Sequence, residues 1–289
     1  MKPTFMKPTF LIFGSKGLIG SHLKQEIIRT FSVEPAEISR ETPISILQNP
    51  FEHPPKHFDE NVPFFAFYCH GPTNPKVALE IHEKFHVQLP GEWYRWLSLN
   101  TNLAAFITCG SVHENLNLSR NNSYLTAKST WHDKVKTNSD HRNLLHLQMH
   151  TVYGNPIPRH SFLGDMAHSI GSDQDFLMSE GHQLREYHHV KDIAALVIQI
   201  SKQKSLWPPS RILPLNHGRP ISLKALATGV FETLKPRSEL KVGAFKSHPD
   251  EIREKQWIPT PHPFTPIYRD PIVGVSEVMA EELKLDIHD

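Results

Sequence analysis

The stretch Phe10–Leu23, FLIFGSKGLIGSHL, decides the fold of this chain. Its first four residues are apolar and predict a short buried strand of a parallel sheet. Three glycines follow at steps of three residues, and Leu and Ile then recur at helical spacing. Strand, glycine turn and helix in this order open a dinucleotide-binding unit, because the helix N-terminus offers free N–H groups to a pyrophosphate. The alternative is an ordinary βα turn whose glycines serve packing alone.

The glycine loop itself predicts how a dinucleotide is held. Gly14 permits the tight turn, Gly17 lets the pyrophosphate approach the backbone, and Gly20 lets the helix pack against the strand. The spacing is GxxGxxG rather than the GxGxxG of most dehydrogenases. The residues of this loop expected to bind the cofactor are Gly14, Ser15, Lys16, Gly17, Leu18, Ile19 and Gly20.

Length and charge limit the classes of protein to be considered. The chain has 289 residues, enough for one large α/β domain or a large domain with a small appendage. Its formal net charge is +1, which gives no electrostatic reason to expect binding to nucleic acid or an anionic membrane. No apolar run approaches the length that spans a bilayer, so we expect no membrane partner.

The two cysteines, Cys69 and Cys109, lie in apolar surroundings and favour a reducing cytoplasm over a disulfide framework. The start, MKPTFMKPTF, lacks the apolar stretch of a signal peptide, and we therefore expect a cytoplasmic protein. Met1–Phe5 is repeated as Met6–Phe10. Either the first copy extends the chain before the first strand, or Met6 is the effective start.

Twenty histidines raise the question of a metal site. The sequence holds no HExxH motif and no cysteine pair at zinc spacing. His146 and His150 are four residues apart in a stretch that looks like a strand, and His188 and His189 are adjacent. We therefore expect scattered histidines and no metal.

Strands and helices alternate along the first half of the chain, which predicts an α/β fold with a Rossmann-type doubly wound parallel sheet. After the first strand, further strands are expected at about 36–40, Phe64–Cys69, Leu103–Thr108 and Leu144–Val152. Helices besides the glycine-loop helix are expected at about Lys76–Val87, Glu92–Leu99 and Tyr124–Val135.

Past Pro156 this rhythm changes. Helical patterns cover Ser161–Ile170, Asp192–Lys202 and Ser222–Leu234, with short strands between them, and Asp192 and Ser222 suit N-caps. We expect residues 1–156 to form an NAD(P)-binding Rossmann domain. Residues 157–289 are expected to form a small α/β substrate lobe interleaved with the end of that domain.

Charges beside the second strand bear on the type of cofactor. That strand ends in Ser39 and Arg40, where dinucleotides without a 2′-phosphate usually meet an acidic residue. Lys16 could approach the same place, and two cations favour NADP(H). The alternative is that Glu41 holds the ribose and that NAD(H) binds. His70 and Gly71 end another strand in a glycine turn, and we expect them over the cofactor.

Tyr124 and Lys128 are four residues apart on a predicted helix, so both side chains project from one face. A phenol titrates near pH ~10. A neighbouring ammonium stabilises the phenolate and lowers that pKa, which suits proton exchange with a carbonyl. The alternative is that Tyr124 and Lys128 are an amphipathic pair on the surface without a role in chemistry. The position argues for chemistry, about a hundred residues beyond the glycine loop and after a strand that ends in small polar residues.

From Thr9 to Met279 the chain resembles the extended short-chain dehydrogenase/reductase family of nucleotide-sugar epimerases, dehydratases and ketoreductases. Six segments match the motifs of that family in the same order. They are GSKGLIG (14–20), TCGSVHE (108–114), YLTAK (124–128), HTVYGNP (150–156), LREYHHVKD (184–192) and LNHGRPISLKAL (215–226).

The resemblance implies roles for particular residues. Tyr124 would be the acid/base, and Lys128 would tune it and bind the nicotinamide ribose. Arg185 and Arg269 would clamp the diphosphate of a nucleotide-sugar, although Arg185 could instead pair with Glu186. The turn after the sixth strand would line the nicotinamide end and the substrate through Thr151, Val152, Tyr153 and Asn155.

Two departures from the family pattern fall at the expected site. Cys109 stands where the family has the hydroxyl that bonds the sugar oxygen, and a thiol is a weak donor. Either Cys109 or Ser111 would orient the substrate. His113 and Glu114 replace Tyr and Gly, so His113 either contacts substrate or merely fills the loop.

The resemblance implies an NAD(P)-dependent oxidoreductase acting on a nucleotide-diphosphate sugar. We expect a 4-ketoreductase of a 4-keto-6-deoxyhexose, because within the family the chain is short and most resembles such enzymes. Gly110 and Ser111 stand where a dehydratase would need an acid/base pair, which disfavours dehydration. The alternatives are a 4-epimerase with tightly bound NAD and a non-catalytic NAD(P) sensor. Family members are often homodimers.

Overall fold

The computed structural model describes residues 7–38, 62–114, 122–137, 142–247 and 262–285. The chain folds into two compact units. The first comprises Met1–Met149 and Ala194–Leu215, and the second comprises His150–Ile193 and Asn216–Asp289. In the part of the chain that is described, we find no helix with both the length and the apolar character needed to cross a membrane.

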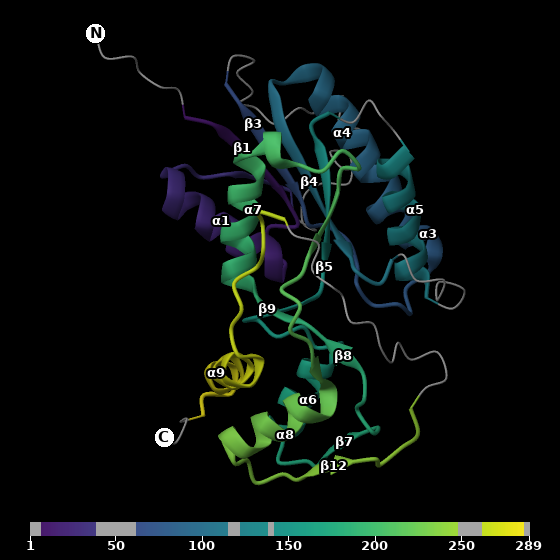
Figure 1. Cartoon of the computed structure of the whole chain (residues 1–289), viewed down its shortest axis with the longest axis vertical. Helices are drawn as coiled ribbons and strands as arrows, with labels where there is room; N and C mark the ends of the chain where they lie inside the picture. The colour runs from purple at the N-terminus through teal and green to yellow at the C-terminus, as the bar shows by residue number, and fades with distance from the viewer. Residues whose placement is uncertain (1–6, 39–61, 115–121, 138–141, 248–261, 286–289) are drawn as a thin grey trace. The chain divides into compact units, whose positions relative to one another are not determined.

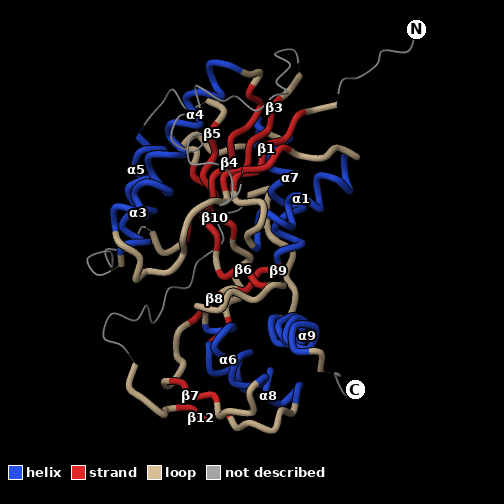
Figure 2. Tube along the Cα trace, turned by 180° about the vertical axis from the view of Figure 1, so that it is seen from behind, coloured by secondary structure: helices blue, strands red, loops and turns tan. Residues whose placement is uncertain are grey.

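The first unit is built on a parallel sheet of six strands (Figures 1 and 2). Its strand order is β10-β5-β4-β3-β1-β2, so the direction of winding reverses between β1 and β3. In open α/β sheets ligands bind at the carboxyl ends of the strands beside such a reversal. The expected doubly wound sheet is confirmed. The strands are β1 (Thr9–Phe13), β2 (Ala36–Ile38), β3 (Phe64–Tyr68), β4 (Leu103–Ser111), β5 (Leu144–Met149) and β10 (Ile212–Leu215).

Helices cover both faces of this sheet (Figures 1 and 2). On one face lie α1 (Leu18–Phe31) and α7 (Val190–Lys202), whose residues from Ala194 onward belong to this unit. On the other face lie α4 (Leu89–Asn100) and α5 (Ser123–Thr137), with α3 (Leu79–Glu83) beside α5. A short 3₁₀ turn, η3 (Lys204–Leu206), follows α7.

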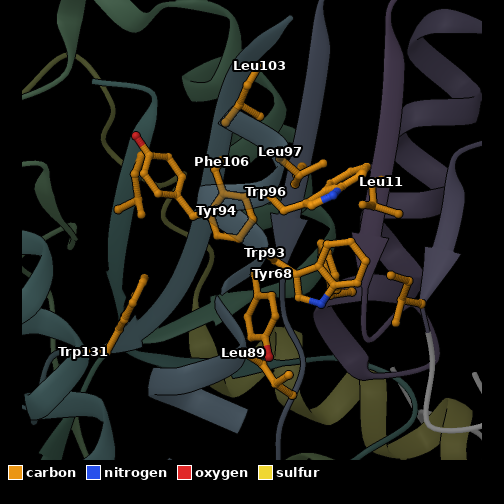
Figure 3. Close-up of a cluster of buried hydrophobic side chains, with 14 of the residues drawn as sticks. Leu11, Tyr68, Leu89, Trp93, Tyr94, Trp96, Leu97, Leu103, Phe106 and Trp131 are labelled. Carbon is orange, nitrogen blue, oxygen red and sulfur yellow. The ribbon is translucent and has the colours of Figure 1, made fainter. Parts of the chain in front are cut away.

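A core rich in aromatic residues fills the space between the sheet and helices α4 and α5 (Figure 3). Trp93 of α4 is fully buried, and its ring centroid lies 4.8 Å from that of Phe13 on β1. Trp96 and Trp131 join the same cluster from α4 and α5. Burial of each large apolar side chain contributes about 1.5–3 kcal/mol. This core therefore fixes α4 and α5 against the strands whose ends carry the site.

The helical segment before β4 differs from the prediction. Two separate helices were expected, but α3, the π-helical turn η1 (Lys84–Gln88) and α4 follow one another without a break. Pro90 in the first turn of α4 has no N–H to donate, which accounts for the wider turn just before it. The predicted strand Leu144–Val152 is also wrong, because it is divided at His150 into β5 and β6 (Thr151–Tyr153).

The second unit combines helices with three strand pairs. β6 pairs with β9 (Tyr187–His189), β7 (Phe176–Met178) with β12 (Leu240–Val242), and β8 (Leu184–Arg185) with β11 (Ile221–Ser222). Helices α6 (Phe162–Gly171), α8 (Leu223–Leu234) and α9 (Pro271–Leu283) share one apolar core with them.

Two helix caps were predicted in this part of the chain. Ser222 is the N-cap of α8, where its hydroxyl accepts a hydrogen bond from the N–H of Ala225 at 3.1 Å. The N-cap expected at Asp192 is wrong. Asp192 lies in the first turn of α7 and binds Arg269 instead.

Candidate functional site

The glycine loop between β1 and α1 is as tight as its sequence predicts. Gly14 has φ +80°, and a Cβ added there would lie 2.8 Å from the carbonyl oxygen of Cys69. A Cβ on Gly20 would lie 2.2 Å from the carbonyl oxygen of Gly14. Helix α1 begins at Leu18, and its N-cap is Gly17, which has no side chain to cap the first turn. The loop therefore has the shape and the free helix N-terminus that suit a pyrophosphate.

The end of β3 lies directly beside this loop, and β4 lies next to β3. The two strands are in register from Phe65↔Ala105 to Tyr68↔Thr108, which brings Cys69 and Cys109 opposite each other. Their Sγ atoms are 3.4 Å apart. The Nζ of Lys128 donates a hydrogen bond of 2.5 Å to the carbonyl oxygen of Cys109. Contacts thus lead without interruption from Gly14 through both cysteines to Lys128.

Tyr124 lies beside Lys128, as their spacing predicts. The Lys128 Nζ is 5.6 Å from the centroid of the Tyr124 ring. Two buried histidines pack against the phenol ring in T-shaped contacts, with centroid distances of 5.7 Å to His82 and 5.4 Å to His86. This packing was not predicted, since the π-helical turn that positions His86 has no clear signal in the sequence.

Burial controls the protonation of these groups. It raises the pKa of the Tyr124 phenol, and the Glu114 carboxylate and the Cys109 thiol act in the same direction. Burial also lowers the pKa of Lys128, although Cys109 and Glu114 partly offset this effect. The expected lowering of the Tyr124 pKa is wrong, because burial dominates and the Lys128 ammonium is directed at a backbone carbonyl. Tyr124 is therefore a protonated phenol at neutral pH.

His70 and Gly71 follow β3, as predicted, and lie close to the aromatic cluster around Tyr124. The ring centroid of His70 is 4.9 Å from that of Phe85. A Cβ on Gly71 would lie 2.3 Å from His86 Cε1, so only glycine fits at this turn. Burial, and secondarily the Lys128 ammonium, lowers the pKa of His86 to about 2, which keeps this imidazole neutral. It forms a hydrogen bond of 2.8 Å with the carbonyl oxygen of Pro72.

Beyond Cys109, strand β4 ends in Ser111, where a buried carboxylate holds the backbone. Glu114 Oε2 accepts the N–H of Ser111 at 2.9 Å, and Glu114 Oε1 bonds His146 Nε2 at 3.0 Å and Gln148 Nε2 at 2.9 Å. The side chains of Glu114 and His146 are fully buried. His113 donates its N–H to the Ser111 hydroxyl at 3.2 Å. Glu114 thus positions the turn that carries Ser111, a role the sequence alone did not predict.

This carboxylate anchors a longer buried network. The Nδ1 of His146 lies 2.7 Å from the Thr108 hydroxyl, which also accepts Trp131 Nε1–H at 3.1 Å. Burial alone would raise the pKa of Glu114, but the charge and hydrogen bond of His146 bring it below its ordinary value. The network ties the end of β4 to β5 and α5.

The remaining predicted residues that the structure describes belong to the second unit. Thr151, Val152 and Tyr153 form β6. The buried Tyr153 hydroxyl faces Gly274, where a Cβ would lie 2.1 Å from it, and burial raises the pKa of Tyr153 to about 12. Asn155 donates to Glu281 Oε2 at 2.8 Å. Arg40 lies outside the described residues.

The two predicted arginines occupy different surroundings. Arg185 ends β8 and donates to the carbonyl oxygen of Leu184 at 2.7 Å. The guanidinium of Arg269 forms a two-pronged ion pair with Asp192, with Nη2 2.8 Å from Oδ1 and Nε bonded to Oδ2.

One group of side chains in the second unit has the composition of a metal site, with ligand atoms of Glu186, His188 and His217 within 4.8 Å of one another. Protein donors already surround the carboxylate. Glu186 Oε2 bonds His188 Nε2 at 3.1 Å and the N–H of His217 at 2.8 Å, and Oε1 accepts the N–H of Gly218 at 3.0 Å. These donors account for a carboxylate at this place, and the expected lack of a metal stays a prediction.

The second unit also contains a pocket of about 400 Å³. Its walls combine aromatic and apolar side chains with carboxylates, hydroxyls and one amide, a mixture that is common in small-molecule sites. Residues that line it include Phe162, Asp165, Asp175, Phe176, Gln183 and Phe245.

No protein-family model matches the sequence, and no curated protein matches it. Several solved structures share its fold. A GDP-6-OMe-4-keto-L-xylo-heptose reductase from C. jejuni is 13% identical, with a TM-score of 0.71 over 97% of this chain and 99% of that one. RMD from Pseudomonas aeruginosa, complexed with NADPH, is 11% identical, with a TM-score of 0.70 over 96% and 99% of the two chains.

The UDP-glucose 4-epimerase of Thermus thermophilus, complexed with NAD, is similar to the same extent. It is 14% identical, with a TM-score of 0.68 over 96% of this chain and 99% of that one. These likenesses confirm the predicted resemblance at the level of the fold. The chain has the Rossmann-type α/β fold of these nucleotide-sugar epimerases and reductases, over nearly its whole length.

Proposed function

We propose that this protein is an NAD(P)-dependent oxidoreductase that reduces the 4-keto group of a nucleotide-diphosphate sugar. One observation carries the proposal. The glycine loop, the paired cysteines, Lys128 and Tyr124 form one continuous set of contacts at the carboxyl ends of β1, β3 and β4. A dinucleotide whose pyrophosphate lies on the α1 N-terminus would extend its nicotinamide along these strand ends.

Each residue has a defined task in this proposal. The nicotinamide supplies the hydride for the ketone carbon when the cofactor is bound. Tyr124 donates its phenolic proton to the ketone oxygen as negative charge develops there. Lys128 would hold the cofactor ribose, and it would stabilise the phenolate that remains once its ammonium turns from the Cys109 carbonyl oxygen to the Tyr124 oxygen. The hydroxyl of Ser111 or the thiol of Cys109 orients the oxygen, and Glu114 fixes the turn that carries Ser111.

Tyr124 would act as the acid in ketone reduction and as the base in epimerisation. An epimerase starts by removing a proton from a sugar hydroxyl, and that step requires a phenolate. Burial and the neighbouring Glu114 and Cys109 raise the Tyr124 pKa and keep the phenol protonated. A protonated phenol is ready to act as the acid in ketone reduction. The 4-epimerase with tightly bound NAD remains the second candidate, since the fold is shared with epimerases.

NADP(H) is the cofactor that we propose, with NAD(H) as the alternative. The acidic side chain on β2 is Glu37, and Lys24 engages it at 2.5 Å. A carboxylate bound by lysine is less able to accept the ribose hydroxyls that distinguish NAD(H). Lys16 in the glycine loop and Arg40 after β2 would supply the positive charge that a 2′-phosphate requires.

The second unit would bind the nucleotide-sugar. Its pocket beside Phe176 and Phe245 would take the nucleoside, and Arg185 would contact the diphosphate. Arg269 can join that contact only if the diphosphate competes with Asp192 for its guanidinium. Tyr153 is buried in the core of the second unit, so its proposed role on the sugar side is limited to supporting β6. Asn155 would reach the sugar only by leaving Glu281, and His113 would contact substrate from the turn after β4.

The test is turnover of a 4-keto-6-deoxy nucleotide-sugar by NADPH with Tyr124→Phe. We expect a loss of about 10²-fold or more in kcat, because the general acid is removed, with NADPH affinity nearly unchanged. Tyr94→Phe, in the apolar core of the same unit, is the matched control. Unchanged turnover in Tyr124→Phe would refute the mechanism.

The nucleotide released when the purified protein is denatured distinguishes the two enzyme candidates. NAD(H) retained in stoichiometric amount would favour the epimerase, which regenerates its cofactor in each cycle. A protein that binds neither NADPH nor NADH would refute both candidates and the NAD(P) sensor.

A further inference from the structure

Cys69 and Cys109, the only cysteines in the sequence, lie on two adjacent strand segments, with Cys69 directly after β3 and Cys109 inside β4 near its end. They follow the last registered pair of β3 and β4, Tyr68↔Thr108. Neighbouring strands lie about 4.7–4.9 Å apart, and disulfides form between Cα atoms about 4.4–6.8 Å apart. The backbone therefore already has the spacing that a cross-link requires.

The side chains are also directed at each other. The two Sγ atoms lie 3.4 Å apart and share a hydrogen bond. An S–S bond is about 2.05 Å long. The sulfurs must therefore approach by about 1.4 Å, a distance that small χ1 rotations can cover without a change in strand pairing.

The environment makes one sulfur the better nucleophile. The hydrogen bond from Cys69 lowers the pKa of Cys109, and the Lys128 ammonium acts in the same direction. The hydrogen bond to Cys109 raises the pKa of Cys69, and burial adds to this. Both residues are partly buried, so access of a small oxidant to Cys109 Sγ is part of what the peroxide experiment below measures. Thiolate character and access decide which cysteines are oxidised.

We propose that Cys69 and Cys109 are a redox modification site, at which a hydroperoxide converts the two thiols into a reversible disulfide. In the first step the Cys109 thiolate attacks one peroxide oxygen, the O–O bond breaks, and a sulfenic acid and hydroxide form. In the second step the Cys69 sulfur attacks Cys109 Sγ, the S–O bond breaks, and the oxygen leaves as water. Overall, two thiols lose two electrons and two protons, and one hydrogen peroxide becomes two waters.

The disulfide would also change the proposed active site, and this consequence rests on the proposed function. The carbonyl oxygen of Cys109 accepts the Lys128 ammonium, and the carbonyl oxygen of Cys69 is the group that Gly14 approaches. The S–S bond takes the Cys109 sulfur out of the position that it holds beside Cys69 and removes its thiol as a donor to the substrate oxygen. Oxidation would therefore lower NADPH-dependent turnover, and a dithiol reductant would restore it.

The first experiment measures the cross-link itself, in the full-length protein under native conditions and without substrate. After treatment with hydrogen peroxide we expect the intact mass to fall by two hydrogen atoms. Tryptic peptides containing Cys69 and Cys109 should then be joined, and dithiothreitol should separate them. Addition of one or more oxygen atoms without a joined peptide, or no change in mass, would overturn the proposal. Because no catalysis is measured, this result is independent of the proposed function.

Two variants sharpen the assignment. Cys69→Ser should leave Cys109 without its partner, so that peroxide adds oxygen to Cys109 and the loss of two hydrogen atoms disappears. Cys109→Ser should react more slowly, because the more acidic thiol is gone. Equal peroxide reactivity of both variants would contradict the order of the two steps.

Turnover before and after oxidation tests the effect on the proposed active site. Wild type should lose NADPH-dependent turnover at least tenfold when the disulfide forms, and dithiothreitol should restore it. A wild-type protein that forms the disulfide in full and keeps its turnover would overturn this effect, because the reaction would then not need the Cys109 thiol.

Discussion

The buried carboxylate of Glu114 provides a test of how the end of β4 is held. Truncation by Glu114→Ala removes the acceptor of three hydrogen bonds, from Ser111 N–H, His146 and Gln148. Breaking one side of a buried charged pair costs about 3–5 kcal/mol, so we expect Glu114→Ala to lower the free energy of unfolding by about 4 kcal/mol. Glu114→Gln keeps the shape but turns one acceptor into a donor, and its cost should be about 2 kcal/mol.

Urea unfolding followed by tryptophan fluorescence measures this loss in the relevant unit. Four of the five tryptophans, Trp93, Trp96, Trp131 and Trp207, lie within the ranges of the first unit. Glu34→Gln is the matched control, because its exposed pair with Lys24 should be worth less than about 1 kcal/mol. Equal losses in Glu114→Gln and Glu34→Gln would refute the role of the buried network.

The contribution of Glu114 also depends on pH, with a sign that follows from its pKa. The folded-state pKa lies below the ordinary value, so unfolding takes up a proton as the pH falls. The stabilisation is complete above about pH 4.5 and is lost as the pH falls through the folded pKa. The difference in stability between wild type and Glu114→Gln should shrink over the same range. A difference that is constant with pH would contradict an ionised, hydrogen-bonded Glu114.

Three further predictions follow from the glycine loop, the cofactor charges and Tyr124. Gly20→Ala places a Cβ against the Gly14 carbonyl oxygen and should abolish NADPH binding, whereas Gly91→Ala, with 3.5 Å to Trp131, should bind normally in the same titration. Arg40→Ala should weaken NADPH about tenfold or more and NADH far less, because it removes a partner of the 2′-phosphate; equal weakening would remove the argument for NADP(H). Since burial raises the Tyr124 pKa, the rate of ketone reduction should not decline through its ionisation below pH ~10, and a decline near neutral pH that Tyr124→Phe abolishes would contradict the assignment.

Much of the fold could be predicted because local pattern and tertiary contact agree in the first unit. The apolar run of β1 becomes a central strand of the sheet, and the glycines meet backbone atoms that leave no room for a Cβ. The prediction of one long strand failed because two neighbouring segments of the chain pair with different strands. The stretch Leu144–Tyr153 forms two strands separated only by His150, of which the first pairs with β4 and β10 and the second with β9. No residue pattern within the stretch signals that change.

Residue spacing predicted only those contacts of the site that lie within one helix or one strand. Tyr124 and Lys128 share one face of α5, as a separation of four residues requires. The partners that control their chemistry come from other elements, namely His82 and His86 from the α3–η1 segment and Cys109 from β4. Such contacts depend on how strands and helices are stacked. For the same reason the raised pKa of Tyr124 could not be anticipated from its lysine neighbour alone.

Hydride transfer to the sugar is the most direct test of the proposed function. The protein would be incubated with NADPH that carries deuterium in the transferable position at C4 of the nicotinamide, together with a 4-keto-6-deoxy nucleotide-sugar. Mass spectrometry and NMR of the product should show one deuterium at C4 of the sugar, and Tyr124→Phe should form almost none of this product. A sugar recovered unreduced, or a product without deuterium at C4, would contradict the proposal that this site reduces a sugar ketone.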